Sequence, residues 1–262
     1  MPATRSNNTN HERRFAFARS LMQPAAAGRV LVCDTSSLAG AAAKFVIRAV
    51  ESAIHERGHC SLALAGGTAW QPTYKEMRKA WLAERVDWGQ VSIYFGDERC
   101  VPADDPRSNY RMATASLLSH APISKATIHR ILAEGPDPTQ AALDYERILP
   151  PSLDVLLLGM GADGHTASLF PHSPALAETA RRVVTGKGPA GLDRITITPP
   201  VIRAAGTTFV LASGVQKSAA IAGALEGPWL PEQLPIQLAH GATWLIDTRA
   251  ARGLRGEYEQ AG

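Results

Sequence analysis

From Arg29 onward the chain alternates short apolar runs with helix-like segments, and this alternation restricts the fold more than any other feature of the sequence. Strands that are apolar along their whole length and separated by helices are typical of parallel sheets covered on both faces. We therefore predict an α/β fold with a Rossmann-like, mostly parallel sheet between helices. The expected strands are Arg29–Cys33, Ser61–Ala65, Val91–Phe95, Asp154–Leu158, Ile195–Thr198, Thr208–Ala212 and Ala242–Ile246.

Length and charge agree with a single α/β domain. The chain has 262 residues and a net charge of +3, which suits one large domain and lacks the basic excess of a nucleic-acid-binding protein. Residues 1–20 are polar and Asn-rich, so we interpret them as a flexible tail before a single domain at 21–262. No apolar run approaches the ~20 residues of a membrane helix. We expect neither a nucleic acid nor a membrane as partner, and the oligomeric state stays open, a monomer included.

The cysteines indicate a reducing compartment. Cys33, Cys60 and Cys100 are odd in number, widely spaced and form no CxxC pair, which disfavours a disulfide framework or a zinc cluster. His55 and His59 have the spacing of a metal pair, but Gly58 breaks the helix between them and no third ligand is evident. We expect a cytoplasmic protein without a bound metal.

Open parallel sheets bind ligands at the carboxyl ends of their strands, so the residues that follow each strand are the candidates for function. Gly66, Gly67 and Thr68 follow the second strand and precede a helix. Glycines allow close approach of the backbone, and a helix N-terminus attracts anions. This loop fits a phosphate cradle, although an ordinary strand-to-helix turn would have the same sequence.

Charged residues follow two further strands. Asp97 and Arg99 come after Val91–Phe95, with Asn109 a few residues on, and Lys217 comes after Thr208–Ala212. Arg99 can bind an anion through its planar guanidinium, and Lys217 can reach the same anion. Asp97 can serve as a base or hold another side chain. The alternatives are a solvated charge run around Asp97 and a solvated surface lysine.

The fourth strand leads into Gly159-Met160-Gly161-Ala162-Asp163-Gly164-His165. The glycines satisfy the GxGxxG pattern of dinucleotide-binding loops, but Pro171 and Pro174 interrupt the helix that this pattern requires. We therefore expect no nicotinamide cofactor. Histidine ionises near neutral pH and suits a general base, and this one has a carboxylate two residues away. His165 and Asp163 are the catalytic candidates.

Taken together, these segments resemble the 6-phosphogluconolactonase family, within the superfamily of glucosamine-6-phosphate isomerases and 6-phosphogluconolactonases. The most specific runs are FGDERCVPADDPRSNYRMA (Phe95–Ala113) and LDVLLLGMGADGHTASLFPHSPAL (Leu153–Leu176). The resemblance implies a sugar-phosphate isomerase/deaminase-like fold, no cofactor, and hydrolysis of 6-phospho-D-glucono-1,5-lactone to 6-phospho-D-gluconate in the oxidative branch of the pentose phosphate pathway.

The resemblance also implies roles for individual residues. His165 would be the general base that activates water, with Asp163 or Asp97 orienting it. Arg99, Lys217 and the Gly66–Thr68 backbone would bind the phosphate of the lactone. Asn109 is a further candidate for substrate binding, and so is Arg203, which stands where the family commonly has Asn.

Two other functions fit the same superfamily. A glucosamine-6-phosphate deaminase would continue after the histidine with an Asn-Glu-Pro segment, whereas this chain continues Thr166-Ala167-Ser168-Leu169-Phe170-Pro171 without a carboxylate. A non-catalytic sugar-phosphate sensor would carry a helix-turn-helix, for which the residues before Arg29 leave no room. Both features favour the lactonase.

Overall fold

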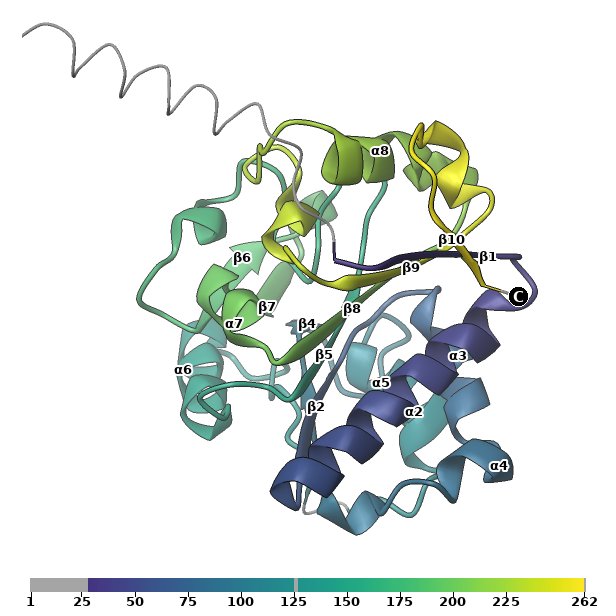
Figure 1. Ribbon diagram of the computed structural model, residues 1–262. Helices are drawn as coiled ribbons and strands as arrows, with labels where there is room; N and C mark the ends of the chain where they lie inside the picture. The colour runs from purple at the N-terminus through teal and green to yellow at the C-terminus, as the bar shows by residue number, and fades with distance from the viewer. Residues whose placement is uncertain (1–27, 125–126, 262) are drawn as a thin grey trace, which may run out of the picture.

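Six of the seven predicted strands lie in one seven-stranded sheet in the computed structural model, which describes residues 28–124 and 127–261 (Figure 1). The remaining strand of this sheet, at its edge, was not predicted from the sequence. Every neighbouring pair in this sheet is parallel, which confirms the predicted fold class. The tail expected at 1–20 lies outside the described residues. In spatial order the strands are β10 (Glu259–Ala261), β1 (Val30–Cys33), β9 (Thr243–Asp247), β8 (Thr207–Ala212), β5 (Val155–Gly159), β2 (Cys60–Leu64) and β3 (Val91–Phe95).

Helices lie on both faces of the parallel sheet, with α2 on one face and α7 on the other (Figure 1). The first of them ends where glycine was expected to end it, because Gly58 takes a left-handed conformation with φ 77°. Among the described residues no helix is long and apolar enough to cross a membrane. The helices are α2 (Leu38–Arg57), α3 (Trp70–Met77), α4 (Ala80–Ala83), α5 (Asn109–Ala113), α6 (Pro138–Ile148), α7 (Pro199–Ala204) and α8 (Ser218–Glu226).

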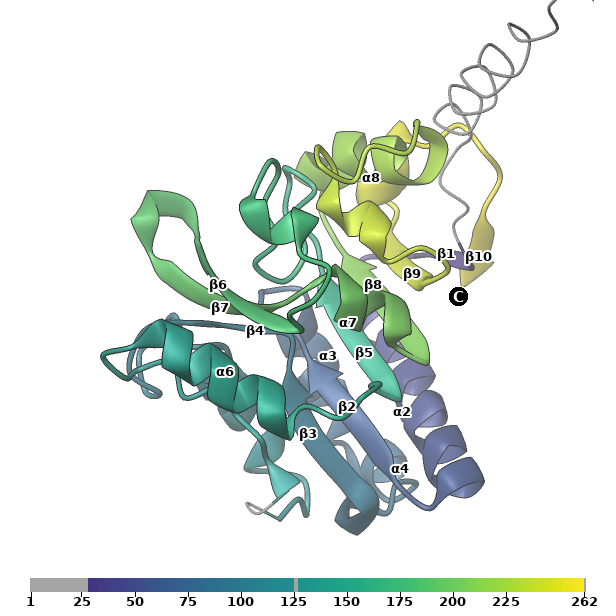
Figure 2. The same ribbon diagram turned by 90° about the vertical axis from the view of Figure 1, so that its left-hand side faces the viewer.

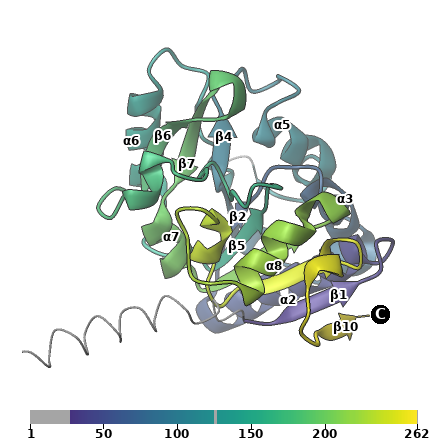
Figure 3. The same cartoon turned by 90° about the horizontal axis from the view of Figure 1, so that it is seen from above.

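A second, antiparallel sheet consists of β4 (Asp97–Arg99), β7 (Asp193–Ile197) and β6 (Val183–Lys187). It projects from the parallel sheet as a separate ribbon (Figure 2). Seen from above, it lies near α5 and α6, far from the edge formed by β1 and β10 (Figure 3). The predicted strand at 195–198 therefore exists but belongs to this small sheet, and the charged residues after β3 form a strand of their own.

The order of the strands creates a switch point between β2 and β5. From β2 the chain passes through α3 to β3 on one side, whereas from β5 it continues to β8 on the other side. Ligands of open α/β sheets bind at such a point, beyond the carboxyl ends of the strands. The loops that follow β2 and β5 therefore face each other at the place where a site is expected.

Candidate active site

A cavity of about 320 Å³ lies at this switch point, a size suited to a small metabolite. Its walls come from the loops after β2, β5 and β8 and from the small sheet. Most of the predicted site residues line it: Gly66, Gly67, Thr68, Asp97, Arg99, His165 and Lys217. We call this cavity the cleft. Residues far apart in the chain thus share one small space.

The loop after β2 requires its glycines. Gly67 has φ 97°, which L side chains rarely adopt. A Cβ on Gly66 would lie 1.9 Å from the side-chain oxygen of Asn109. The carbonyl oxygen of Gly66 is also 3.6 Å from the place where a Cβ on Gly159 would lie. The loops after β2 and β5 therefore pack against each other, with backbone on both sides.

The His165 ring is fixed on one side by a carboxylate. Its Nδ1 lies 2.6 Å from Oδ1 of Asp163, and its ring centroid lies 4.6 Å from that of Phe170. Asp163 accepts the hydrogen bond from Nδ1–H, so Nε2 is left as the proton acceptor. The side chain is 32% exposed, which leaves it open to water and substrate.

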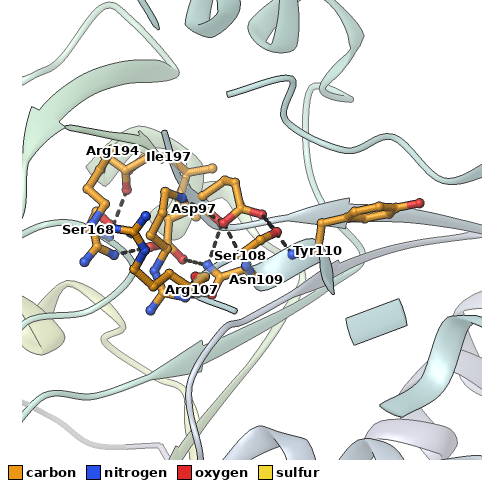
Figure 4. Close-up of polar contacts among 11 residues, drawn as sticks. Asp97, Arg107, Ser108, Asn109, Tyr110, Ser168, Arg194 and Ile197 are labelled. Carbon is orange, nitrogen blue, oxygen red and sulfur yellow. Dashed lines mark hydrogen bonds and ion pairs between the residues drawn. The ribbon is translucent and has the colours of Figure 1, made fainter. Parts of the chain in front are cut away.

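Asp97 holds other side chains in place and does not contact His165. It is only 6% exposed. Its carboxylate accepts hydrogen bonds from the Ser168 hydroxyl at 2.6 Å and from the Asn109 amide at 3.0 Å (Figure 4). Of the two carboxylates proposed to orient the base, the one in contact with it is Asp163. The charge run is not solvated, because its next residue, Glu98, is also buried.

Glu98 organises the segment that follows the small strand. Its carboxylate accepts hydrogen bonds from the backbone N–H groups of Asn109 and Tyr110 and from the Ser108 hydroxyl. The two N–H groups lie in the first turn of α5 and have no acceptor within the helix. The carboxylate therefore satisfies the hydrogen bonding of the helix N-terminus. Burial raises the pKa of Glu98, and the backbone hydrogen bonds from Tyr110, Asn109 and Arg99 oppose that rise.

Asn109 and Arg203 do not line the cleft. The Asn109 amide group donates to the carbonyl and carboxylate oxygens of Asp97, and its oxygen accepts a hydrogen bond from the Arg99 guanidinium. Asn109 therefore contacts two cleft residues, Asp97 and Arg99, through its side-chain amide. Arg203 is exposed on α7 and is not among the residues that line the cleft.

Arg194 is a cleft residue that sequence reasoning missed. It pairs directly with Arg99 across the antiparallel strands β4 and β7, and both line the cleft. The Nε atoms of both are buried without a hydrogen-bond partner among the described residues. Burial lowers the pKa of Arg194, and the charge of Arg99 lowers it further, while Asp97 and Glu98 act in the opposite direction. Two guanidinium groups held side by side form a site for an anion.

Lys217 supplies a third cation. It lies at the end of the short helix η6 (Val215–Lys217), directly before α8. Burial lowers its pKa, and the negative charge of Asp247 partly opposes this. Within the described ranges no carboxylate oxygen lies within 4.0 Å of its amine. The Lys217 side chain is half-buried and lines the cleft, which differs from a fully solvated surface lysine. No cluster of three or more metal-ligating side chains occurs in the part of the chain that the structure describes.

The structure thus combines a parallel α/β sheet with a cleft at its switch point, which three cations line together with a histidine that contacts a carboxylate. These features define an α/β class of proteins with a small-molecule cleft at the switch point. The sequence model described as "Glucosamine-6-phosphate isomerases/6-phosphogluconolactonase" matches residues 33–246. The chain belongs to this family.

Individual proteins of this family are similar to the chain in sequence and in structure. The chain is similar to a 6-phosphogluconolactonase of Synechocystis sp., with 35% identity over 240 residues that cover 87% of this chain and 93% of that protein. The solved 6-phosphogluconolactonase from Trypanosoma cruzi has a TM-score of 0.77 at 26% identity, covering 90% of this chain and 99% of that one. A monomeric glucosamine-6-phosphate deaminase has a TM-score of 0.75 at 22% identity, covering 86% of this chain and 100% of that one, a likeness of fold alone.

Proposed function

We propose that the protein hydrolyses 6-phospho-D-glucono-1,5-lactone to 6-phospho-D-gluconate, as a 6-phosphogluconolactonase of the oxidative pentose phosphate pathway. The observation that carries this proposal is the presence of one imidazole and three cations on a single cleft of about 320 Å³. The substrate has the matching chemistry, with an ester at one end and a phosphate at the other. The names of the relatives support the same reaction.

The cations would hold the phosphate. A phosphate monoester carries about −1.5 to −2 charges at neutral pH. Arg99, Arg194 and Lys217 line the cleft together with the backbone of Gly66–Thr68, which lies at the positive end of α3. Binding energy from this remote group would place the lactone carbonyl beside the base.

His165 would act as the general base. Its Nε2 takes a proton from water as the water oxygen attacks the lactone carbonyl, and Asp163 stabilises the resulting imidazolium. When the tetrahedral intermediate collapses, the ring oxygen leaves and takes this proton from the imidazolium. The product is the open hydroxy acid, and the enzyme returns to its starting state. A positioned base typically contributes about 10²–10⁴-fold to the rate.

Backbone amides would stabilise the oxyanion. The turn before His165 offers four candidates, but Gly161 N–H donates to the carbonyl of His165 and Gly164 N–H donates to that of Gly161. Ala162 and Asp163 are the remaining donors in the turn. Losing one oxyanion donor commonly costs about 10²–10³-fold in kcat.

The direct test supplies freshly made lactone and follows 6-phosphogluconate through a coupled dehydrogenase, with glucosamine 6-phosphate as comparison substrate. We expect lactone hydrolysis well above its spontaneous rate and no ammonia from the amino sugar. Release of ammonia without acceleration of lactone hydrolysis would assign the site to a deaminase.

A further inference from the structure

A second cavity adjoins the cleft and shares part of its wall. It has a volume of about 580 Å³ and shares Gly67, Thr68, Arg99 and Arg194 with the cleft. Beyond these residues it is lined mainly by the segment around α5, which contributes Arg107 and Arg111. We call it the second groove. Nothing in the proposed hydrolysis uses this space.

The second groove is strongly basic. Four arginines line it, and no carboxylate from the part of the chain that the structure describes does so. Arg107 is neutralised, because its guanidinium forms a two-pronged ion pair with Asp105 at 2.9 and 2.8 Å. Arg111 is exposed and, among the described residues, has no carboxylate oxygen within 4.0 Å; the charge of Asp105 reaches it only at longer range. An unpaired cation therefore lies in the groove beside the shared arginines.

The shared arginines are held in an arrangement that is unfavourable without an anion. Arg99 and Arg194 are direct cross-strand neighbours, and like charges in that position destabilise a sheet. The nearest carboxylate oxygen to Arg194 belongs to Asp97, at 4.0 Å, although the Arg194 side chain is only 14% exposed. Both Nε atoms lack a hydrogen-bond acceptor within residues 28–124 and 127–261. Three guanidinium groups without close ion pairs thus border one groove.

We propose that the second groove binds a small molecule bearing a diphosphate group. A single phosphate monoester brings about two negative charges, whereas the groove offers three cations without close partners, and two linked phosphates can contact Arg111 and the shared arginines together. Because Arg99 and Arg194 line both cavities, an occupied groove withdraws them from the cleft. If the proposed lactonase function holds, the diphosphate inhibits by competing with the substrate phosphate.

The binding test uses the full chain and inorganic pyrophosphate in isothermal titration calorimetry, which requires no activity. We expect pyrophosphate to bind at least roughly tenfold more tightly than inorganic phosphate, and Arg111→Ala to weaken it by a similar factor, as expected for loss of a charge-assisted hydrogen bond. Arg111→Lys, which keeps the charge without the planar fork, should recover part of the loss.

Two control variants distinguish binding in the second groove from binding in the cleft and from an effect of the protein's net charge. Lys217 lines only the cleft, so Lys217→Ala should leave pyrophosphate binding unchanged. Arg252 is exposed and lines neither cavity, so Arg252→Ala should also bind pyrophosphate like the wild type. Wild-type pyrophosphate affinity in Arg111→Ala, or loss of binding in Lys217→Ala alone, would overturn the proposal.

A kinetic test addresses the competition. In the coupled lactone assay, pyrophosphate should raise KM without lowering kcat, and its inhibition constant should be roughly tenfold higher in Arg111→Ala. An inhibition constant unchanged by that substitution would show that pyrophosphate acts in the cleft. Calorimetry would detect pyrophosphate binding even in a protein without lactonase activity. The groove proposal and the lactonase proposal can therefore be refuted independently.

Discussion

At the scale of single residues, the position of the His165 ring depends on the absence of a side chain at position 161. A Cβ on Gly161 would lie 2.1 Å from the ring Nδ1 and 2.4 Å from the Asp163 carboxylate. Contacts this short force a neighbour to move, and the neighbours are the proposed base and its partner. Gly161, which matched a dinucleotide-binding pattern in the sequence, thus leaves room for the His165 ring.

Gly161→Ala should therefore lower kcat while the protein remains folded. The loss should approach the factor of about 10²–10⁴ that a positioned base contributes. Steady-state kinetics on fresh lactone measures this. Gly186→Ala on β6 is the matched control, since a Cβ there meets no atom within 4 Å, and it should retain wild-type kcat. Wild-type turnover in Gly161→Ala would show that the ring tolerates displacement.

Lys217 should affect binding more than turnover. Lys217→Met should raise KM, and the Kd of 6-phosphogluconate, by roughly tenfold or more, because it removes a charge-assisted contact to the phosphate. Burial lowers the lysine pKa from 10.5, so in the wild type the charge is lost as pH rises through a range below that of free lysine. Product affinity measured by calorimetry should fall over this range in the wild type and not in Lys217→Met. Equal pH dependence in both proteins would exclude the lysine as an anchor.

At the scale of elements, Asp247 at the end of β9 fixes the loop that presents Lys217. Its buried carboxylate accepts hydrogen bonds from Gly214 N–H and the Ser213 hydroxyl after β8, and also from Thr35 and Ala250. Burial by itself would raise the Asp247 pKa, but these hydrogen bonds outweigh it and hold the pKa below 3.8. The end of one strand therefore positions the loop after its neighbour.

Asp247→Asn should lower the free energy of unfolding by about 1–3 kcal/mol at neutral pH, the usual cost of losing hydrogen bonds to a buried charge. The carboxylate has a lowered pKa in the folded state, so its contribution is fully present above pH 3.8 and is lost as pH falls through the folded-state pKa. Urea unfolding should show a gap between wild type and variant at neutral pH that narrows in acid. The exposed Asp104→Asn is the control, and a gap independent of pH would contradict this account.

The elements also show which parts of the site the sequence could predict. Apolar runs predicted seven of the strands but not β4, β6 and β10. The rule that ligands bind beyond strand ends brought His165, Arg99, Lys217 and Gly66–Thr68 together. Arg194 was missed because its place beside Arg99 depends on the register of β4 against β7, which no local pattern specifies. The contacts of Asn109 with Arg99 and Asp97 could not be predicted for a similar reason, since they depend on how the segment after β4 packs.

At the scale of the whole molecule, the two ends of the described chain meet in one sheet, since β1 lies between β9 and β10. The single domain predicted at 21–262 should therefore unfold in one cooperative transition. Denaturant curves followed by far-UV circular dichroism and by tryptophan fluorescence should coincide, and 6-phosphogluconate should shift both midpoints upward together. Two separated transitions, or a ligand shift in only one of the signals, would indicate independent units.

The central claim is that one imidazole and a distant group of cations act on the same substrate molecule. The most direct measurement is the steady-state kinetics of His165→Ala on freshly made 6-phosphogluconolactone, corrected for spontaneous hydrolysis. We predict a kcat about 10²–10⁴-fold below that of the wild type, with KM and 6-phosphogluconate affinity almost unchanged because the phosphate contacts remain. Undiminished turnover in His165→Ala would contradict the account.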